Sequence, residues 1–459
     1  MKTKRFLSVF LLLTLLLTLL AVPCAAAPVG EVTPIPVMDV AAKAALLVDG
    51  DSGEVLYAKN EHQELYPASI TKIMTALLVL EAIDSGKLDM QEKLTATDHA
   101  MSTLSDDGST AGIKVGEIMT VENLLYCMLV VSANEACNIL AERVAGSVDA
   151  FVVQMNAKAK ALGCVNTQFI NATGLHDPEH YTSAWDIYLI AKAAMTHPAF
   201  MTFCDTKDVY IPATNLSEQR HLYTTNYLLS QFRALGYVNR DAHGIKTGST
   251  SDAGHCLVST AKRGSRSLIS VVLGAEKIIK PDGKSDVQSF SETSRLFSWG
   301  LQYFTRQTVL SGDDLLAEVP VSLSREVNYV TVHPKEDVEL LLPNDLSPDM
   351  LEKTVTLKAE TAKAPIAAGD ILGEVTLRHG DKVYATVPLL ALNDVSASKL
   401  LVMQDKLTAF FSRTLVRVLS VIFLLVVLLL VVLWMLSRRR RHRYGRKVTH
   451  SSTYKGRRR

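Results

Sequence analysis

The sequence is poor in cysteine, with six in 459 residues, and it contains no Cys-x-x-Cys pair. Structural zinc sites are usually assembled from such pairs, so the spacing argues against a zinc centre. Five of the cysteines follow the N-terminal segment, mostly within apolar runs, and an odd number suits a disulfide scaffold poorly. The pattern disfavours a disulfide-stapled fold and leaves a single bridge open.

Net charge is also nearly absent, because 48 Lys and Arg face 47 Asp and Glu. The balance is uneven along the chain, however. Eleven basic residues lie in the last 22 positions and three lie in the first five, and removing these from the formal +1 leaves −13 for the rest. We therefore expect an acidic body, and the length allows about two or three domains.

The N-terminus has the parts of a secretory signal. Three basic residues precede an apolar run that extends to Val22, and small residues follow it. We predict a signal peptide over residues 1–27, which we exclude from the fold. Cys24 allows a second interpretation as a lipid-modified cysteine, but Pro23 stands where a small residue is expected.

The C-terminus contains a long stretch without charge, from Val418 to Leu436. Nineteen residues in a helix span about the hydrocarbon thickness of a bilayer, so we predict a single transmembrane helix over residues 416–436. The basic tail, residues 437–459, should then lie in the cytoplasm and the body outside. Nucleic-acid binding is the rival interpretation of the tail, but a basic cluster directly after a span usually contacts anionic lipid. We expect no nucleic-acid partner.

Four Ser-x-x-Lys pairs occur in the chain, and their contexts differ. Only Ser69 opens a segment that is apolar on every side, which indicates a helix buried in a large core. A Ser and a Lys three residues apart can meet on a helix, and a buried Lys72 is costly unless it is paired or neutral. A neutral Lys72 could act as a base. The other pairs are Ser259/Lys262, Ser396/Lys399 and Ser452/Lys455.

Two further polar motifs each occur once. Ser132-Ala133-Asn134 lies between two apolar segments that we predict to be helices, where the simpler interpretation is a helix N-cap. Lys246-Thr247-Gly248 lies in a predicted strand, where the simpler interpretation is an edge strand whose lysine prevents aggregation and whose glycine marks a bulge.

Taken together, Ser-x-x-Lys, Ser-x-Asn and Lys-Thr-Gly in this order form the set found in class A β-lactamases and penicillin-binding proteins. The chain resembles the low-molecular-mass penicillin-binding proteins of the D-alanyl-D-alanine carboxypeptidase (S11 peptidase) family over most of residues 40–395. The likeness includes residues 66–69 (Tyr-Pro-Ala-Ser), 171–175 (Asn-Ala-Thr-Gly-Leu), 244–248 (Gly-Ile-Lys-Thr-Gly) and 298–300 (Ser-Trp-Gly).

The resemblance implies a role for each motif. Ser69 would be the nucleophile, Lys72 its base, Ser132 a proton relay, and Asn134 a group that holds Lys72 and the substrate amide. Lys246, Thr247, Gly248 and Ser249 would bind the substrate, and backbone N–H groups of Ser69 and Ser249 would stabilise the oxyanion. No metal or organic cofactor is required.

The resemblance also implies the fold. We expect an α/β (α+β) catalytic domain of the serine β-lactamase and transpeptidase type over residues 40–312, with an antiparallel sheet flanked by helices. A hairpin is predicted from Ala44–Asp49 and residues 54–59. Residues 316–395 contain six short alternating segments punctuated by Pro and Gly, which indicate a second, small all-β domain.

The expected reaction is removal of the terminal D-alanine from a peptidoglycan stem pentapeptide, through an acyl-enzyme on Ser69. Penicillin and other β-lactams would be covalent inhibitors. Two alternatives remain: a β-lactamase, which would need a deacylating Glu although no Glu-x-x-Leu-Asn follows Ser132, and a non-catalytic wall-binding or scaffolding protein.

Overall fold

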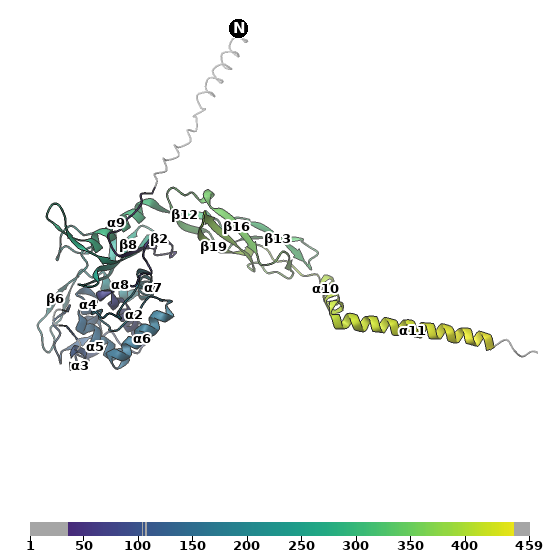
Figure 1. Ribbon diagram of the computed structural model, residues 1–459, viewed down its shortest axis with the longest axis horizontal. Coiled ribbons are helices and arrows are strands. Elements are labelled where there is room, and N and C mark those ends of the chain that lie inside the picture. Colours follow the sequence, from purple (N-terminus) through teal and green to yellow (C-terminus); the bar gives the residue numbers. More distant parts are fainter. Residues whose placement is uncertain (1–34, 103, 106–107, 445–459) are drawn as a thin grey trace, which may run out of the picture. The chain divides into compact units, whose positions relative to one another are not determined.

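The computed structural model describes residues 35–102, 104–105 and 108–444, so the predicted signal peptide and most of the basic tail lie outside the described residues. The chain forms two compact units (Figure 1). The first contains residues up to 307 together with 339–350, and the second contains 308–338 together with the residues from 351 onward.

The first unit is built on a five-stranded antiparallel sheet with strand order β2-β1-β9-β8-β7. Its strands are β1 (Ala44–Asp49), β2 (Val55–Lys59), β7 (Ala242–Thr250), β8 (Gly254–Arg263) and β9 (Arg266–Ala275). The predicted hairpin of β1 and β2 is confirmed, and β7 forms an edge of the sheet.

Helices cover both faces of this sheet (Figure 1). This fits β1, whose six side chains are all buried although successive ones point to opposite faces. Ala44, Leu46 and Val48 pack into the core beneath the larger helical group. Ala45 and Leu47 point to the other face, where they pack with Phe297 and neighbouring residues of α9 (Gln288–Tyr303). The expected antiparallel sheet flanked by helices is confirmed.

The larger helical group comprises α2 (Lys72–Asp84), α4 (Val121–Val130), α5 (Asn134–Ala145), α6 (Val148–Ala161), α7 (Ala184–Met195) and α8 (Pro198–Cys204). Shorter elements of this unit are η1 (Ala68–Thr71), β3 (Lys93–Thr95), α3 (Asp98–Ser102), β4 (Ile118–Thr120), β5 (Asp208–Ile211), β6 (Arg220–Tyr223), β10 (Lys277–Ile279) and β11 (Ser285–Val287).

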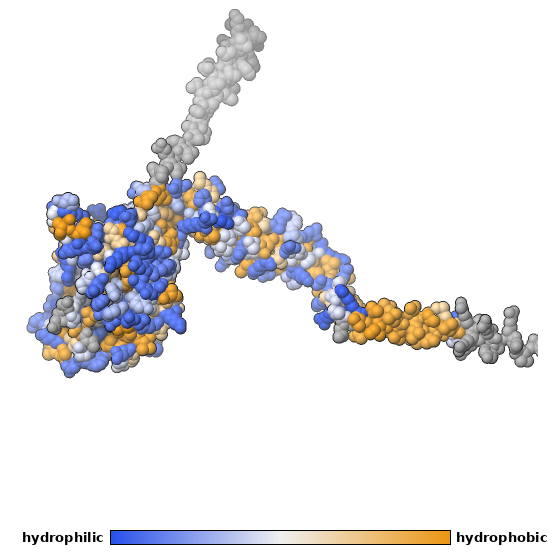
Figure 2. All heavy atoms as spheres, in the orientation of Figure 1, coloured by the Kyte–Doolittle hydropathy of each residue, from blue (hydrophilic) through white to orange (hydrophobic). Residues whose placement is uncertain are grey.

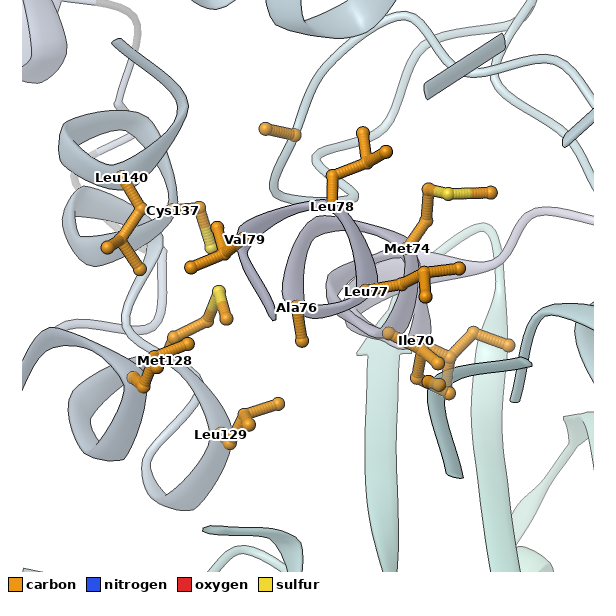
Figure 3. Packing of buried hydrophobic residues seen from close by; sticks show 14 of the residues in the cluster. Ile70, Met74, Ala76, Leu77, Leu78, Val79, Met128, Leu129, Cys137 and Leu140 are labelled. Carbon is orange, nitrogen blue, oxygen red and sulfur yellow. The ribbon is translucent and has the colours of Figure 1, made fainter. Parts of the chain in front are cut away.

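Helix α2 is the centre of this group. Its residues from Lys72 to Leu80 are all buried, and it contacts α4, α5, α6, α7 and α8. In Figure 3, Val79 lies toward Cys137 and Leu140 of α5, while Met74 and Leu78 leave the helix on other sides. A helix that is apolar all round needs neighbours all round, so the prediction from the run behind Ser69 is confirmed.

The second unit contains a six-stranded sheet with the order β16-β18-β19-β14-β13-β17. The strands are β13 (Ala317–Ser322), β14 (Tyr329–Pro334), β16 (Glu352–Leu357), β17 (Ala362–Lys363), β18 (Ile371–His379) and β19 (Lys382–Ala391), with η2 (Pro348–Met350) preceding β16. This unit is the second, small β domain that the sequence predicted. One predicted strand differs: β15 (Val338–Pro343) pairs with β12 (Phe304–Leu310) instead of joining this sheet.

Two helices follow the second sheet, α10 (Lys399–Ser412) and α11 (Thr414–Tyr444). Residues 416–438 of α11 are long and apolar enough to cross a membrane, and no other described helix meets that test. Figure 2 shows this helix as a continuous apolar surface. A span at this position was predicted, and its length and composition fit one.

Candidate active site

Ser69 and Lys72 meet at the junction of η1 and α2. The sequence pattern indicated one helix, but Ser69 lies in a 3-10 turn and Lys72 is the first residue of the α-helix. Side chains three residues apart are nearly eclipsed in a 3-10 turn, and Lys72 Nζ lies 2.8 Å from Ser69 Oγ. The predicted contact is therefore present, through a tighter turn than expected.

Lys72 is fully buried and has two further partners. Its Nζ donates to Asn134 Oδ1 at 2.8 Å and to the carbonyl oxygen of Thr173 at 2.6 Å. Burial lowers the pKa of Lys72 to about 8. A neutral amine has two N–H donors for these two acceptors and keeps its lone pair for the proton of Ser69. The geometry thus suits a base.

Ser132 and Asn134 do not act as helix caps, so the simpler interpretation of this triplet is wrong. Helix α5 begins at Asn134, its N-cap is Ala133, and no side chain bonds to the exposed N–H groups. Ser132 has a φ of 66°, which is strained for a residue other than glycine. Its buried hydroxyl has no hydrogen-bond partner among the described residues. Such a hydroxyl is available to a bound molecule.

Lys246 lies on edge strand β7, yet its side chain is only 1% exposed. The interpretation of a solvent-facing lysine that prevents aggregation is therefore wrong. Burial and the neighbouring charge of Lys72 lower the pKa of Lys246 to about 7. Its ammonium donates to the carbonyl oxygen of Thr247 at 2.9 Å. Lys72 and Lys246 are thus both buried and coupled by charge, and each loses its proton well below the usual lysine pKa.

Gly248 lets β7 approach the Ser69 turn closely, and the strand bulge lies earlier, between His243 and Lys246. A Cβ on Gly248 would lie 2.9 Å from the Pro67 carbonyl oxygen and 3.0 Å from the Ser69 nitrogen. Any larger residue would push the strand away from Ser69.

A cleft extends from Ser69 in two directions. The Thr247 arm is lined by Ser132, Thr225, Tyr227, Thr247, Gly248, His255, Cys256, Val287, Ser289 and Phe290. The His176 arm is lined by Ser105, Gly108, Asn134, Gly174, Leu175, His176, Thr250, Ser251 and Asp252. Ser69, Ser109 and Ser249 line both arms, so the arms meet at Ser69.

Six of the eight predicted site residues line this cleft, and the other two, Lys72 and Lys246, are buried next to residues that do. Three further contributors were not predicted. The Thr173 carbonyl oxygen binds Lys72, and a backbone group leaves no side-chain signal in a sequence. Gly174 carries a φ of 85° and packs so tightly that a Cβ would lie 1.9 Å from the Ala68 carbonyl oxygen. Thr225 Oγ1 lies 2.6 Å from Thr247 Oγ1, and nothing distinguishes Thr225 from other threonines in the sequence.

A buried histidine supports the turn that carries Ser69. His180 Nδ1 accepts from the Ile170 N–H at 3.3 Å, so Nε2 carries the proton and donates to Thr71 Oγ1 at 2.9 Å. Thr71 in turn donates to the Ala68 carbonyl oxygen at 2.9 Å. Ala68 has a φ of 48°, so this chain of donors holds a strained residue next to Ser69. Burial lowers the pKa of His180 to about 4.

The cysteines in the described part of the chain take no part in covalent bonding. All five are free and buried. Burial raises the pKa of the Cys137 thiol to about 11, which leaves it a poor nucleophile. The single bridge that the sequence left open is absent among these residues.

Two family models match the chain. One, described as D-alanyl-D-alanine carboxypeptidase, matches residues 30–277. The other, described as penicillin-binding protein 5, C-terminal domain, matches residues 304–397. The first match includes all eight predicted site residues, and it ends before Val287, Ser289 and Phe290 of the Thr247 arm.

Individual relatives agree with these matches. The chain is 32% identical over 354 residues to D-alanyl-D-alanine carboxypeptidase DacF of Bacillus subtilis, covering 77% of this chain and 86% of the relative. It is 30% identical to the carboxypeptidase DacC of Escherichia coli, with 77% and 84% covered. Among solved structures, penicillin-binding protein 5 of Haemophilus influenzae has a TM-score of 0.65 at 28% identity, covering 79% of this chain and 100% of that one.

Proposed function

Because the chain belongs to the D-alanyl-D-alanine carboxypeptidase family, we propose that it removes the terminal D-alanine from peptidoglycan stem pentapeptides. The observation that carries the proposal is the buried contact between Lys72 and Ser69, in a site that also contains Ser132, Asn134 and Lys246. A serine has little nucleophilicity without such a base.

In the first step, Ser69 Oγ attacks the carbonyl carbon of the penultimate D-alanine, and its proton passes to neutral Lys72. The resulting oxyanion is stabilised by backbone N–H groups of Ser69 and Ser249. The C–N bond then breaks, and the leaving D-alanine amine takes a proton through the Ser132 hydroxyl. Asn134 positions Lys72 and the substrate amide. This leaves an ester on Ser69 and free D-alanine.

In the second step, water attacks the ester carbon and transfers a proton to Lys72. The bond to Ser69 then breaks, and Lys72 returns this proton to Ser69 Oγ. The shortened peptide leaves with a new carboxylate. The same attack on a β-lactam ring gives an acyl-enzyme with penicillin, and such ligands would be covalent inhibitors.

The terminal carboxylate of the substrate is held in the Thr247 arm. Thr247 supplies a hydroxyl, and its buried neighbour Lys246 becomes the cation when the substrate binds, because an anion beside a buried amine raises the pKa of that amine. The charge on Lys246 then favours the neutral form of Lys72. Charge-assisted hydrogen bonds of this kind are strong. Thr225 lies 2.6 Å from the Thr247 hydroxyl and orients it. Thr225 is thus a positioning residue for carboxylate recognition.

Labelling with a fluorescent penicillin tests the nucleophile. The label should appear on Ser69 after tryptic mapping by mass spectrometry, and Ser69→Ala should abolish it. Ser259→Ala is the matched control, because Ser259 belongs to another Ser-x-x-Lys pair and should leave labelling intact. A label on any other serine would refute the assignment. Mass spectrometry of a pentapeptide after incubation with the protein tests the reaction itself.

The other two functions have less support. Among the described residues that line the cleft, none is a glutamate, so the deacylating group of a class A β-lactamase has no candidate there. A purely structural role would not require two buried lysines or an unpartnered buried hydroxyl, since each is unfavourable in a folded protein.

We further propose the arrangement in the membrane. Residues 40–312 form the catalytic domain, 316–395 the β domain, 416–436 the span and 437–459 a cytoplasmic tail, with the catalytic domain outside the cell after removal of residues 1–27. Protease added to intact cells should degrade the body and spare an epitope on the tail. An epitope that is lost under these conditions would overturn the orientation.

A further inference from the structure

The proposed reaction uses the Thr247 arm of the cleft and assigns no role to the side chains of the His176 arm. Strand β7 connects the two arms, since Thr247 lines one and Thr250 the other. It is also the terminal strand of its sheet, with β8 on one side only. An edge of this kind can pair with an extended peptide.

The position of the leaving group fixes the direction of the bound peptide. If the terminal carboxylate lies at Thr247, the scissile carbonyl lies at Ser69, and the part of the peptide that precedes it must continue along the His176 arm. The substrate therefore runs antiparallel to β7. The residue before the acylated D-alanine lies beside the β7–β8 turn, where Ser251 and Asp252 are found.

The described residues of the His176 arm carry an uneven charge. Asp252 is the acidic residue among them, and they include no lysine or arginine. Its carboxylate is 49% exposed and accepts one hydrogen bond, from the Ser251 hydroxyl at 3.0 Å. His176 Nδ1 lies 3.9 Å away, beyond hydrogen-bond distance. The carboxylate thus retains capacity for a further donor.

His176 is held in place from its other side. Its ring meets the ring of Tyr66 edge-on, with centroids 4.7 Å apart. This contact keeps the imidazole at the wall of the arm. A cation placed between the two side chains can donate to Asp252 and pack against the imidazole.

We propose that Asp252, with His176 beside it, binds a side-chain ammonium on the residue that precedes the acylated D-alanine. This inference rests on the proposed function and names a specificity-determining residue of the same site: Asp252 favours peptides with a free side-chain amine over the same peptides with that amine acylated. The cleft then recognises opposite charges at its two ends, an anion near Lys246 and a cation near Asp252.

The test compares two peptides of the form X-D-Ala-D-Ala, in which X is either Nα-acetyl-lysine or Nα,Nε-diacetyl-lysine. The full chain in detergent should cleave the peptide with the free amine about two- to fivefold faster by kcat/KM, the range expected for a partly exposed ion pair. Asp252→Asn should bring the ratio to about one, and Asp252→Lys should invert it. Asp149→Asn, the same change on α6 away from the cleft, should keep the wild-type ratio.

Each outcome separates the two proposals. Cleavage of both peptides with the same ratio in the wild type and in Asp252→Asn would overturn this inference and leave the carboxypeptidase intact. Absence of cleavage of either peptide by the wild type would refute the proposed function and the inference with it. A preference that persists at high salt would also contradict the ion pair, because screening weakens contacts between exposed charges.

Discussion

The two units bury different kinds of side chain. Among the described residues, every buried polar or charged side chain belongs to the first unit, including Lys72, Lys246, Glu117, Glu135 and Asp186. The buried side chains of the second unit are apolar without such an exception, as in Val332, Val375 and Leu377. One unit therefore accepts unfavourable burial, and the other follows the hydrophobic rule throughout.

This difference points to the buried polar and charged groups of the first unit, whose burial lowers stability but can provide chemical reactivity. Burying a charge is unfavourable unless it is paired or becomes neutral. Glu117 is paired with Arg220 at 2.7 Å, and Glu135 accepts from Thr110 and the Ala111 N–H, each at 2.7 Å. The two lysines have no carboxylate partner among the residues that the structure describes, and burial shifts their pKa values instead. A displaced pKa is what a catalytic base requires.

The largest effect should come from a cavity in the apolar unit. Leu377→Ala removes a fully buried side chain from β18, and such truncations typically destabilise by about 2–5 kcal/mol. Calorimetry should show a lower transition temperature for the second unit, while kcat/KM on a soluble peptide stays within about twofold. A large loss of activity would mean that the β sheet contributes to the reaction.

In the first unit, which contains the proposed catalytic residues, we expect Lys246→Met to raise stability and to lower activity. Lys246→Met removes a buried cation and keeps an apolar chain of similar length, which should raise the free energy of unfolding by about 1 kcal/mol or more. Removing the cation should lower kcat/KM about a hundred- to a thousandfold. Urea titration and peptide hydrolysis measure the two quantities.

Lys353→Met provides the control for this variant, because Lys353 lies exposed on β16 of the second unit. It should change neither quantity by more than about 0.5 kcal/mol. A loss of stability in Lys246→Met comparable to that of Leu377→Ala would contradict the exchange of stability for activity.

His180 should make the catalytic unit sensitive to acid. The unfolded chain binds a proton near the ordinary histidine pKa of about 6.5, whereas the folded chain binds it only at about 4. As the pH falls between these values, unfolding takes up a proton, so stability decreases by roughly 3 kcal/mol. The loss is complete below about 4 and absent above 6.5.

His180→Gln can still donate to Thr71, but it has no titrating group. The difference in unfolding free energy between wild type and variant should therefore shrink or reverse as the pH falls from 7 to 4, measured by urea titration at each pH. Asp177, His176 and Lys72 also act on His180, and they are present in both proteins. Parallel pH profiles of the two proteins would contradict the neutral buried imidazole.

The sequence predicted the elements of the site because its pattern and its local geometry agree there. Ser69 and Lys72 lie on a tight helical turn, and their contact follows from the spacing. The same spacing at Ser259 and Lys262 lies on strand β8, where positions three apart face opposite sides. Ser259 instead donates to the Gly244 carbonyl oxygen at 2.8 Å. Only the surrounding apolar run distinguished the two pairs.

What the sequence did not predict arises from contacts between distant segments. The Thr173 carbonyl oxygen accepts a hydrogen bond from Lys72, which lies 101 positions away in the sequence. Every residue has a backbone carbonyl, so the residue type does not reveal this contact. Likewise, β15 has the apolar texture of the strands around it, yet pairs with β12. The local sequence pattern indicates that a strand forms, but it does not determine which other strand it pairs with. The capping interpretation of Ser132 was wrong because Ser132 takes a φ of 66° and Ala133, not Ser132, is the N-cap of α5.

The smallest effect concerns a single hydroxyl of the catalytic unit, that of Thr247. If it donates to the terminal carboxylate, Thr247→Val removes a charge-assisted hydrogen bond of roughly 1.5–3 kcal/mol. Hydrolysis should slow about tenfold to a hundredfold. Amidating the C-terminus of the substrate should slow the wild type by a similar factor, since the same bond loses its charged acceptor.

The two changes should not add, because they act on one interaction. Thr247→Val should therefore barely distinguish the acid from the amide, and Thr225→Val should give an intermediate ratio, since Thr225 only orients Thr247. Steady-state rates of the three proteins on both substrates measure this coupling. Equal wild-type rates on acid and amide would refute carboxylate recognition, and would favour an enzyme that cleaves within a peptide over one that cleaves only at its end.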